Sequence, residues 1–203
     1  GTTPTIHAGP YTTSGVYPYY VTYTNSCGTY TDSSIVTVDL TNALITASTD
    51  VSCNAGDDGT ATVTADGGDA PYTYAWSNGD TTDIIDSLMA GSYTVTVYDA
   101  NMWPATASVT ITEPTAITAT TSATSSSCGV ANGIITMTPS GGTPSYSFAW
   151  SNGQTTQNDT GLVSGTYTVT ITDANGCVAN ATQSVTDAGS PNIVLTTQDV
   201  VCG

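Results

Sequence analysis

The five cysteines are the side chains in this chain with the clearest capacity for covalent chemistry. None belongs to a Cys-x-x-Cys pair of the metal-binding type, and the single histidine, His7, lies near the amino end. Cysteines spread in this way are typical of a disulfide framework, which forms in oxidising compartments. We therefore expect an extracellular, cell-surface location and disulfide bonds among Cys27, Cys53, Cys128, Cys177 and Cys202.

The acidic residues are the other group that could bind a ligand, and they are unevenly distributed. Residues 46–118 contain ten of the 16, whereas residues 119–191 contain only Asp159, Asp173 and Asp187. Calcium is coordinated by several oxygens from carboxylates and turn carbonyls. The weak calcium candidates are the acids of two turn-like segments, Asp57, Asp58, Asp66 and Asp69. No other cofactor is expected.

The basic residues needed for most enzymatic and nucleic-acid chemistry are missing. The 203 residues include no lysine and no arginine, which gives a formal charge of -16 and a pI near 4.1. Phosphate backbones and anionic lipids are bound mainly through Lys and Arg, so we expect neither partner. With His7 as the only side chain that titrates near neutrality, general acid–base catalysis is also disfavoured, and we expect no enzyme.

Several short motifs recur along the chain at a spacing of about 74 residues, which indicates an internal repeat. Gly67-Gly68, Trp76-Ser77-Asn78-Gly79 and Asp99-Ala100-Asn101 each return 74 positions later. The opening segment matches the end of a repeat, and Val201-Cys202-Gly203 matches a repeat's beginning. We expect a segment of a longer array, with the end of one repeat at 1–44, complete repeats at 45–117 and 118–190, and the first strand of a further repeat at 191–203.

Within each repeat, apolar and polar residues alternate with a period of two. Examples are Ala61, Val63 and Ala65, which alternate with threonines. Alternation of this kind, rich in β-branched and aromatic residues and interrupted by Gly, Asn, Asp and Pro, predicts short half-buried strands. Six or seven strands in about 74 residues favour an all-β fold of tandem immunoglobulin-like antiparallel β-sandwiches.

A leucine followed five residues later by a tyrosine, at the start of a strand, indicates a tyrosine corner. The tryptophan of each repeat is then expected in the core, on the third strand of the sandwich. The residues assigned these structural roles are Trp76, Trp150, Tyr93, Tyr167, Leu88 and Leu162.

The repeat motif resembles the SprB-type repeat. The shared pattern is Gly-Gly-x-x-Pro, Trp-Ser-Asn-Gly-x-Thr-Thr, Leu-x-x-Gly-x-Tyr and Asp-Ala-Asn-Gly-Cys, and it covers nearly all of residues 46–187. The chain departs from it at Met102-Trp103, where Gly-Cys is expected, and at Pro18-Tyr19 inside a strand. The resemblance implies a repetitive region of a large surface or secreted protein of Bacteroidota, such as a gliding-motility adhesin exported by type IX secretion.

The sequence is compatible with several disulfide pairings. A bridge between Cys128 and Cys177, within one repeat, is preferred because closing a loop of this size would stabilise by about 4 kcal/mol. However, the turns carrying these two residues should lie at opposite poles of a sandwich, beyond the ~5.5 Å Cα separation of a disulfide. The alternatives are bridges at repeat junctions, namely Cys27–Cys53, Cys177–Cys202 or Cys53–Cys177.

The function expected from these features is that of a structural or adhesive segment of a cell-surface stalk or filament. The partners expected for it are neighbouring repeats of the same chain, other copies in a filament, and glycans. The alternatives are a self-assembling fibre or sheath subunit and a carbohydrate-binding module. The last would use the crowded tyrosines of the opening segment, Tyr11, Tyr17, Tyr19, Tyr20, Tyr23 and Tyr30, because aromatic rings stack on sugars.

Overall fold

The chain folds entirely into antiparallel strands. The computed structural model describes residues 12–25 and 27–189, and these residues form fourteen strands and no helix. The described part therefore also lacks any helix long and apolar enough to cross a membrane. The chain divides into two compact units, one made of residues 1–51 and 57–112 and the other of residues 52–56 and 113–203. The loop 52–56 thus belongs to the second unit although it lies within the first unit's sequence.

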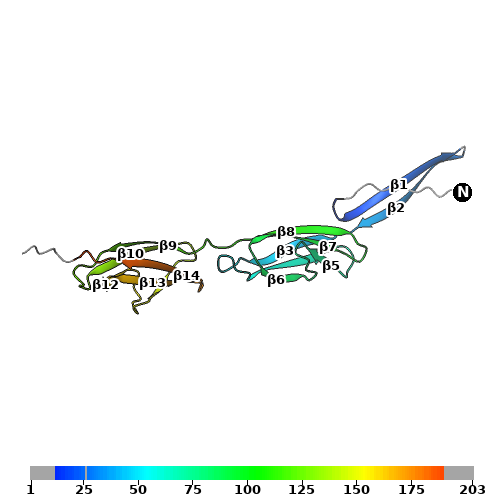
Figure 1. Cartoon of the computed structure of the whole chain (residues 1–203). Helices are drawn as coiled ribbons and strands as arrows, with labels where there is room; N and C mark the ends of the chain where they lie inside the picture. The colour runs from blue at the N-terminus through cyan, green and yellow to red at the C-terminus, as the bar shows by residue number, and fades with distance from the viewer. Residues whose placement is uncertain (1–11, 26, 190–203) are drawn as a thin grey trace, which may run out of the picture. The chain divides into compact units, whose positions relative to one another are not determined.

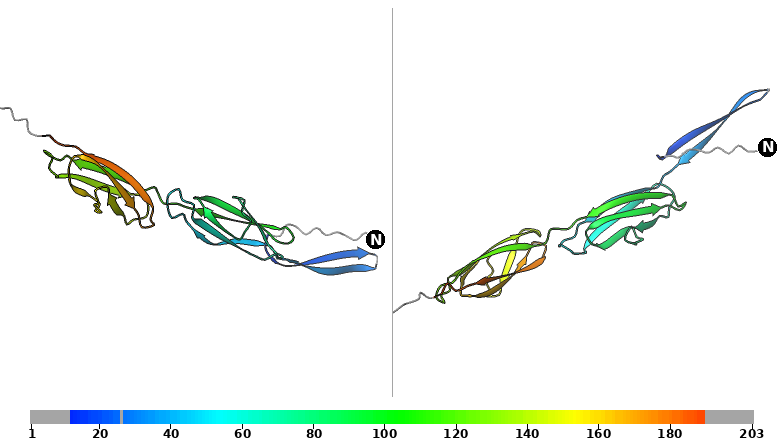
Figure 2. Two further views of the ribbon diagram at one scale, coloured as in Figure 1. Left: turned by 60° about the horizontal axis from the view of Figure 1, so that its bottom comes forward. Right: turned by 45° about the horizontal axis from the view of Figure 1, so that its top comes forward.

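The first unit is a sandwich of two three-stranded sheets. Its strands are β3 (Asn42–Thr49), β4 (Gly59–Asp66), β5 (Thr73–Trp76), β6 (Ile84–Leu88), β7 (Gly91–Tyr98) and β8 (Pro104–Ile111). One sheet has the order β3-β4-β6 and the other β5-β7-β8, and Figures 1 and 2 show them as two layers. In immunoglobulin nomenclature these sheets are A-B-E and C-F-G.

The second unit repeats this topology. Its strands are β9 (Thr118–Thr124), β10 (Gly133–Ser140), β11 (Ser147–Trp150), β12 (Asp159–Leu162), β13 (Gly165–Thr172) and β14 (Val178–Val185). They form sheets of order β12-β10-β9 and β11-β13-β14. The predicted fold class, tandem immunoglobulin-like antiparallel sandwiches, is confirmed.

Each sandwich closes over its own apolar core because alternate residues of both sheets point inward. The first core contains Val51, Ala61, Val63, Trp76, Ile85, Leu88, Val95, Val97 and Ile111. The second contains Ile135, Met137, Trp150, Leu162, Val169, Ile171 and Val185. Outward-facing hydroxyls bond across neighbouring strands, as in Thr49 with Thr60 at 2.8 Å and Thr118 with Ser140 at 2.9 Å. The abundant threonine therefore serves the wet faces of the sheets.

A two-stranded hairpin precedes the first sandwich and clusters with the first unit. It consists of β1 (Gly15–Asn25) and β2 (Gly28–Val38), paired antiparallel from Gly15↔Val38 to Asn25↔Gly28. The hydroxyl of Tyr17 donates to the carbonyl of Thr13 at 2.8 Å, which is the bond of a tyrosine corner. The Tyr167 hydroxyl in β13 makes the corresponding bond to the carbonyl four residues earlier.

Candidate functional site

Two carboxylates organise the turns that close the β7–β8 and β13–β14 hairpins. Asp173 is only 6% exposed and accepts hydrogen bonds from the backbone amides of Thr143, Asn175 and Cys177 at 2.7–2.9 Å. Its hydrogen bond from Thr143, helped by those from Cys177, Asn175 and Gly176, outweighs burial and lowers the pKa of Asp173 below the usual 3.8. Asp173 therefore stays ionised and fixes the backbone at Cys177.

Asp99 has the same role in the first unit. It is 3% exposed, and burial raises the pKa of its carboxyl. Hydrogen bonds from the backbone amides of Trp103, Asp69 and Asn101 act the other way and leave the pKa of Asp99 below 3.8. The repeated Asp-Ala-Asn motif is therefore a carboxylate-centred turn.

At the second glycine of the Gly-Gly motif, the backbone passes directly over these carboxylates. Gly142 has φ +60°, and a Cβ there would lie 2.6 Å from the Asp173 Oδ2 atom. Gly68 has φ +63°, and its Cβ would lie 2.7 Å from Asp99 Oδ2. Positive φ and close approach both require glycine.

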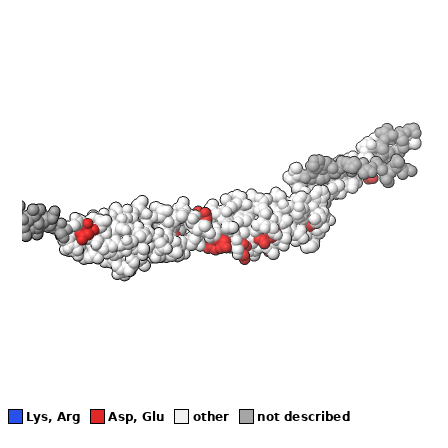
Figure 3. Space-filling model, viewed as in Figure 1, with Lys and Arg blue, Asp and Glu red and all other residues white. Residues whose placement is uncertain are grey.

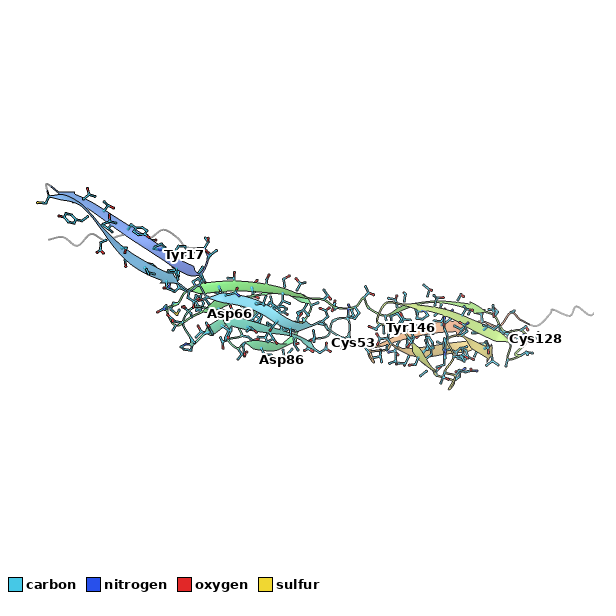
Figure 4. The ribbon with its side chains drawn as sticks, turned by 180° about the vertical axis from the view of Figure 1, so that it is seen from behind. Tyr17, Cys53, Asp66, Asp86, Cys128 and Tyr146 are labelled. Carbon is cyan, nitrogen blue, oxygen red and sulfur yellow. A yellow bond between two sulfur atoms is a disulfide. The ribbon has the colours of Figure 1, made fainter. Side chains whose placement is uncertain are left out.

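The disulfide joins Cys53 to Cys177, with the two Cα atoms 5.6 Å apart. The preferred prediction, Cys128–Cys177, is therefore wrong, and the alternative Cys53–Cys177 bridge is the one formed. Cys128 and Cys177 cannot pair because they lie at opposite ends of β14. Cys177 directly precedes this strand, whereas Cys128 Sγ lies 3.5 Å from the carbonyl of Gly189, which follows the strand's other end. Eight residues of strand span about 26 Å, and Figure 4 shows Cys53 and Cys128 at opposite ends of the second unit.

The loop that carries Cys53 is held by Glu113. Its carboxylate accepts hydrogen bonds from the Asn54 side-chain amide at 3.0 Å and from the Ala55 backbone amide at 2.6 Å. The second bond supports the left-handed conformation of Ala55, at φ 58°. The Asn175 amide donates to the carbonyl of Ser52 at 3.0 Å. Both half-cystines thus sit in backbone segments fixed by carboxylate or amide side chains.

The other cysteines differ in their surroundings. Cys128 is an exposed thiol, in a left-handed conformation at φ 52°. Cys27 lies in the β1–β2 turn, at the position that corresponds to Cys177, and its side chain is exposed. Cys202, together with the predicted strand at 191–203, lies outside the described residues.

The calcium candidates are not brought into one group. Asp57 and Asp58 precede β4, while Asp66 and Asp69 lie at its far end. Asp69 accepts a hydrogen bond from the side-chain amide of Asn101 at 2.6 Å. Across the described ranges, no cluster of three or more His, Cys, Asp or Glu side chains is placed to hold a metal ion. Acidic side chains do gather over the first unit on the face shown in Figure 3.

The tyrosines of the opening segment are divided by the strand alternation of β1. Tyr17 and Tyr19 are half-buried, whereas Tyr20 is 70% and Tyr30 45% exposed. Tyr11 lies outside the described residues, and no side-chain position is described for Tyr23. Among the opening tyrosines whose side chains the structure describes, Tyr20 and Tyr30 are thus the exposed rings.

The residues expected to be structural lie in the two cores or at their edges. Trp76 and Trp150 are each 4% exposed and donate from the indole to the carbonyls of Thr82 and Thr156, both at 2.9 Å. Leu88 and Leu162 are each 2% exposed. The hydroxyls of Tyr93 and Tyr167 donate to the carbonyls four residues earlier, at 3.0 Å, in tyrosine corners.

Two residues with defined roles were not identified from the sequence. Glu113 holds the cysteine loop, and the only signal for it is that an acid, Asp187, recurs 74 residues later. Asp159 is fully buried and accepts from the Asn152 side-chain amide at 3.2 and 2.9 Å. It occupies the place of Ile85 in the first repeat, so the alternation marks it as a core position.

A shallow groove of about 390 Å³ lies beside the bridge in the second unit. It is lined mainly by small side chains and backbone, and by no aromatic ring: Cys53, Asn54, Thr115, Ala116, Ile117, Gly142, Gly176, Cys177, Val178 and Ala179. Such a lining offers no platform on which a sugar could stack.

The fold and these turns define a class, that of tandem immunoglobulin-like sandwich repeats with a disulfide bridge. Within this class, residues 45–81 and 120–155 match the family model of the SprB repeat. The two matches begin at the same strand of successive sandwiches, so both segments are similar to the SprB repeat.

Several solved structures show distant similarity to this chain. A search of curated proteins gave no match. Among solved structures, three N-terminal domains of the bacteriophage RB49 Highly Immunogenic Outer Capsid protein are 19% identical, with a TM-score of 0.44, over 74% of this chain and 59% of that one. The N-terminal eight Ig domains of Down Syndrome Cell Adhesion Molecule are 19% identical, with a TM-score of 0.43, over 86% of this chain and 27% of that one. The chain thus spans less than two thirds of either structure.

Proposed function

We propose that this chain is a structural, adhesion-type repeat segment of an extracellular stalk or filament. The observation that carries the proposal is the SprB match at the same place in two successive sandwiches. The disulfide supports the extracellular part, because such bonds persist in oxidising compartments. The partners are neighbouring repeats, and a role in gliding motility and an origin in Bacteroidota belong to the same proposal.

The chemistry of the surface agrees with this role. The chain has no lysine or arginine and a formal charge of -16, so copies repel one another and stay soluble. The polar side chains described above form hydrogen bonds within turns and across neighbouring strands. Such a surface suits a segment that separates a binding part of a protein from the cell.

The location is tested with antibodies raised against residues 45–190 and applied to intact cells of the source organism. We expect labelling without permeabilisation, and its loss after treatment of the cells with proteinase K. Fab fragments of the same antibodies should reduce attachment of the cells to surfaces. Labelling that requires permeabilisation would overturn the proposal.

Sedimentation of the purified chain separates the stalk from a self-assembling fibre. A stalk segment sediments as a monomer over a wide concentration range, in the presence and absence of reductant. Oligomers that grow with concentration would replace the stalk with the fibre subunit.

A further inference from the structure

The Cys53–Cys177 bridge closes a covalent loop that contains most of both sandwiches. The two cysteines are 124 residues apart. Cys53 lies between β3 and β4, and Cys177 lies between β13 and β14. All strands from β4 to β13 are therefore inside the loop, while β1, β2, β3 and β14 are outside it.

A covalent loop changes how a chain carries tension. Force applied to the two ends of a polypeptide follows the shortest covalent path, and residues inside a closed loop are not on that path. Here the path runs along the chain to Cys53, crosses the two sulfur atoms, and continues from Cys177. We propose that this disulfide is a tension bypass, which takes the interiors of both sandwiches out of the load path.

Of the two sandwiches, only the first strand of one, β3, and the last strand of the next, β14, stay on the load path, together with the β1–β2 hairpin that precedes them. β3 is paired with β4 from Asn42↔Asp66 to Thr49↔Thr60. β14 is paired with β13 from Gly165↔Val185 to Thr172↔Val178. Tension can peel these two strands away, but it cannot pull out the strands between them while the bridge is intact.

The first sandwich shows that this turn does not need a cysteine for its own structure. There, Trp103 stands at the position of Cys177, and its backbone amide donates to Asp99 Oδ1 at 2.9 Å. The amide of Cys177 donates to Asp173 Oδ1 at the same distance. Because the turn forms equally well without a thiol, the specific contribution of Cys177 is the covalent bond itself.

The surroundings of the bridge favour its formation. Glu113 fixes the loop of Cys53 through Asn54 and Ala55, and Asp173 fixes the backbone of Cys177. Both half-cystines are thereby held by hydrogen-bonded backbone on either side of the bridge. The bypass is a property of the chain itself, and only its use in a stalk rests on the function proposed above.

Single-molecule force spectroscopy tests the bypass. The chain is placed between handle domains of known unfolding length and pulled from both ends, either oxidised or after reduction with a phosphine. At about 3.3–3.6 Å per residue, the bridge should hide roughly 410–450 Å of extended chain. We expect the total length released by the oxidised chain to be shorter than that of the reduced chain by this amount.

Two variants sharpen the test. Cys177→Ser should release the full length under oxidising conditions, like the reduced wild type. Cys128→Ser keeps the bridge and should match the oxidised wild type. The full extended length between the handles, measured in the same pulls, depends only on the covalent path and not on folding stability, so a destabilised Cys177→Ser chain still tests the bypass.

Two results would overturn the inference. One is an equal released length before and after reduction. The other is a difference of only about 160–180 Å, which would indicate the shorter Cys128–Cys177 loop. Neither result bears on the extracellular location, which the antibody experiment decides separately, so the two proposals can fail independently.

Discussion

Asp173 links the ionisation of one carboxyl to the stability of the second sandwich. Its folded pKa lies below the 3.8 of an ordinary aspartate, because backbone amides stabilise the charged form. A lowered folded pKa contributes stability that is complete above the unfolded pKa and disappears as the pH falls through the folded value.

We expect Asp173→Asn to lower the free energy of unfolding at pH 7 and to weaken its dependence on pH below about 4. Urea unfolding of both proteins between pH 2 and pH 6 measures this. The exposed Asp86, changed to Asn, is the control for loss of one negative charge. Parallel pH profiles for wild type and Asp173→Asn would show that another group causes the acid sensitivity.

At the residue level, the sequence predicts inward-facing side chains better than covalent partners. The positions of Trp76 and Trp150 follow from the alternation of apolar residues, which is a local property. The pairing of Cys53 with Cys177 depends on which turns come within disulfide distance, and spacing along the chain does not encode this. Asp159 could have been identified, since it takes a core position that Ile85 occupies one repeat earlier.

The Gly-Gly turn is the element that ties each sandwich to its carboxylate. We expect Gly142→Ala to destabilise the second unit by about 2–3 kcal/mol, because left-handed φ costs about 1–2 kcal/mol and the new Cβ would meet Asp173 Oδ2. Thermal and urea unfolding measure the loss.

Gly153→Ala is the matched control for this substitution. Gly153 also has a positive φ, at +89°, but a Cβ there would meet nothing within 4 Å. Gly153→Ala should therefore lower the free energy of unfolding by only about 1 kcal/mol, which is the cost of a left-handed φ for alanine. Equal losses in the two variants would mean that the close approach over the carboxylate does not matter.

The strands and their immunoglobulin-like layout were predictable, but the unit to which the loop at 52–56 belongs was not. Period-two alternation and Gly, Asn and Pro turns predict six or seven strands per repeat, and the structure has six in each. The assignment of loop 52–56 to the second unit was not accessible, because it arises from contacts of Cys53 and Asn54 with residues more than 50 positions away.

Considered as a whole, the molecule carries charges of one sign only, apart from His7 and the chain's amino end. With 16 acidic residues and no lysine or arginine, added salt screens repulsion. We expect the melting temperature of each sandwich to rise by roughly 4–8 °C, equivalent to about 1 kcal/mol for a domain of this size, between low and moderate sodium chloride. Differential scanning calorimetry measures this rise.

A variant with fewer acids provides the control. Changing Asp80, Asp83 and Asp86 to Asn should reduce the salt dependence, because these residues lie in the acid-rich first unit. A melting temperature that falls with salt would contradict the expectation. Calcium chloride at equal ionic strength separates screening from binding, since only specific coordination by Asp57, Asp58, Asp66 or Asp69 would give a larger rise.

The hydroxyl pairs on the sheet faces have a consequence for how the repeats diverge. On β7 and β8, Ser92 lies beside Thr110, with 3.4 Å between their hydroxyl oxygens. On β13 and β14, Thr166 lies beside Ser184 at 3.2 Å, with the two residue types exchanged between the strands. Either hydroxyl can act as donor, so a serine–threonine exchange adds or removes one methyl group at a hydrated position and keeps the contact. Mutational drift can therefore exchange residues on the outer faces of successive repeats without loss of the cross-strand contact.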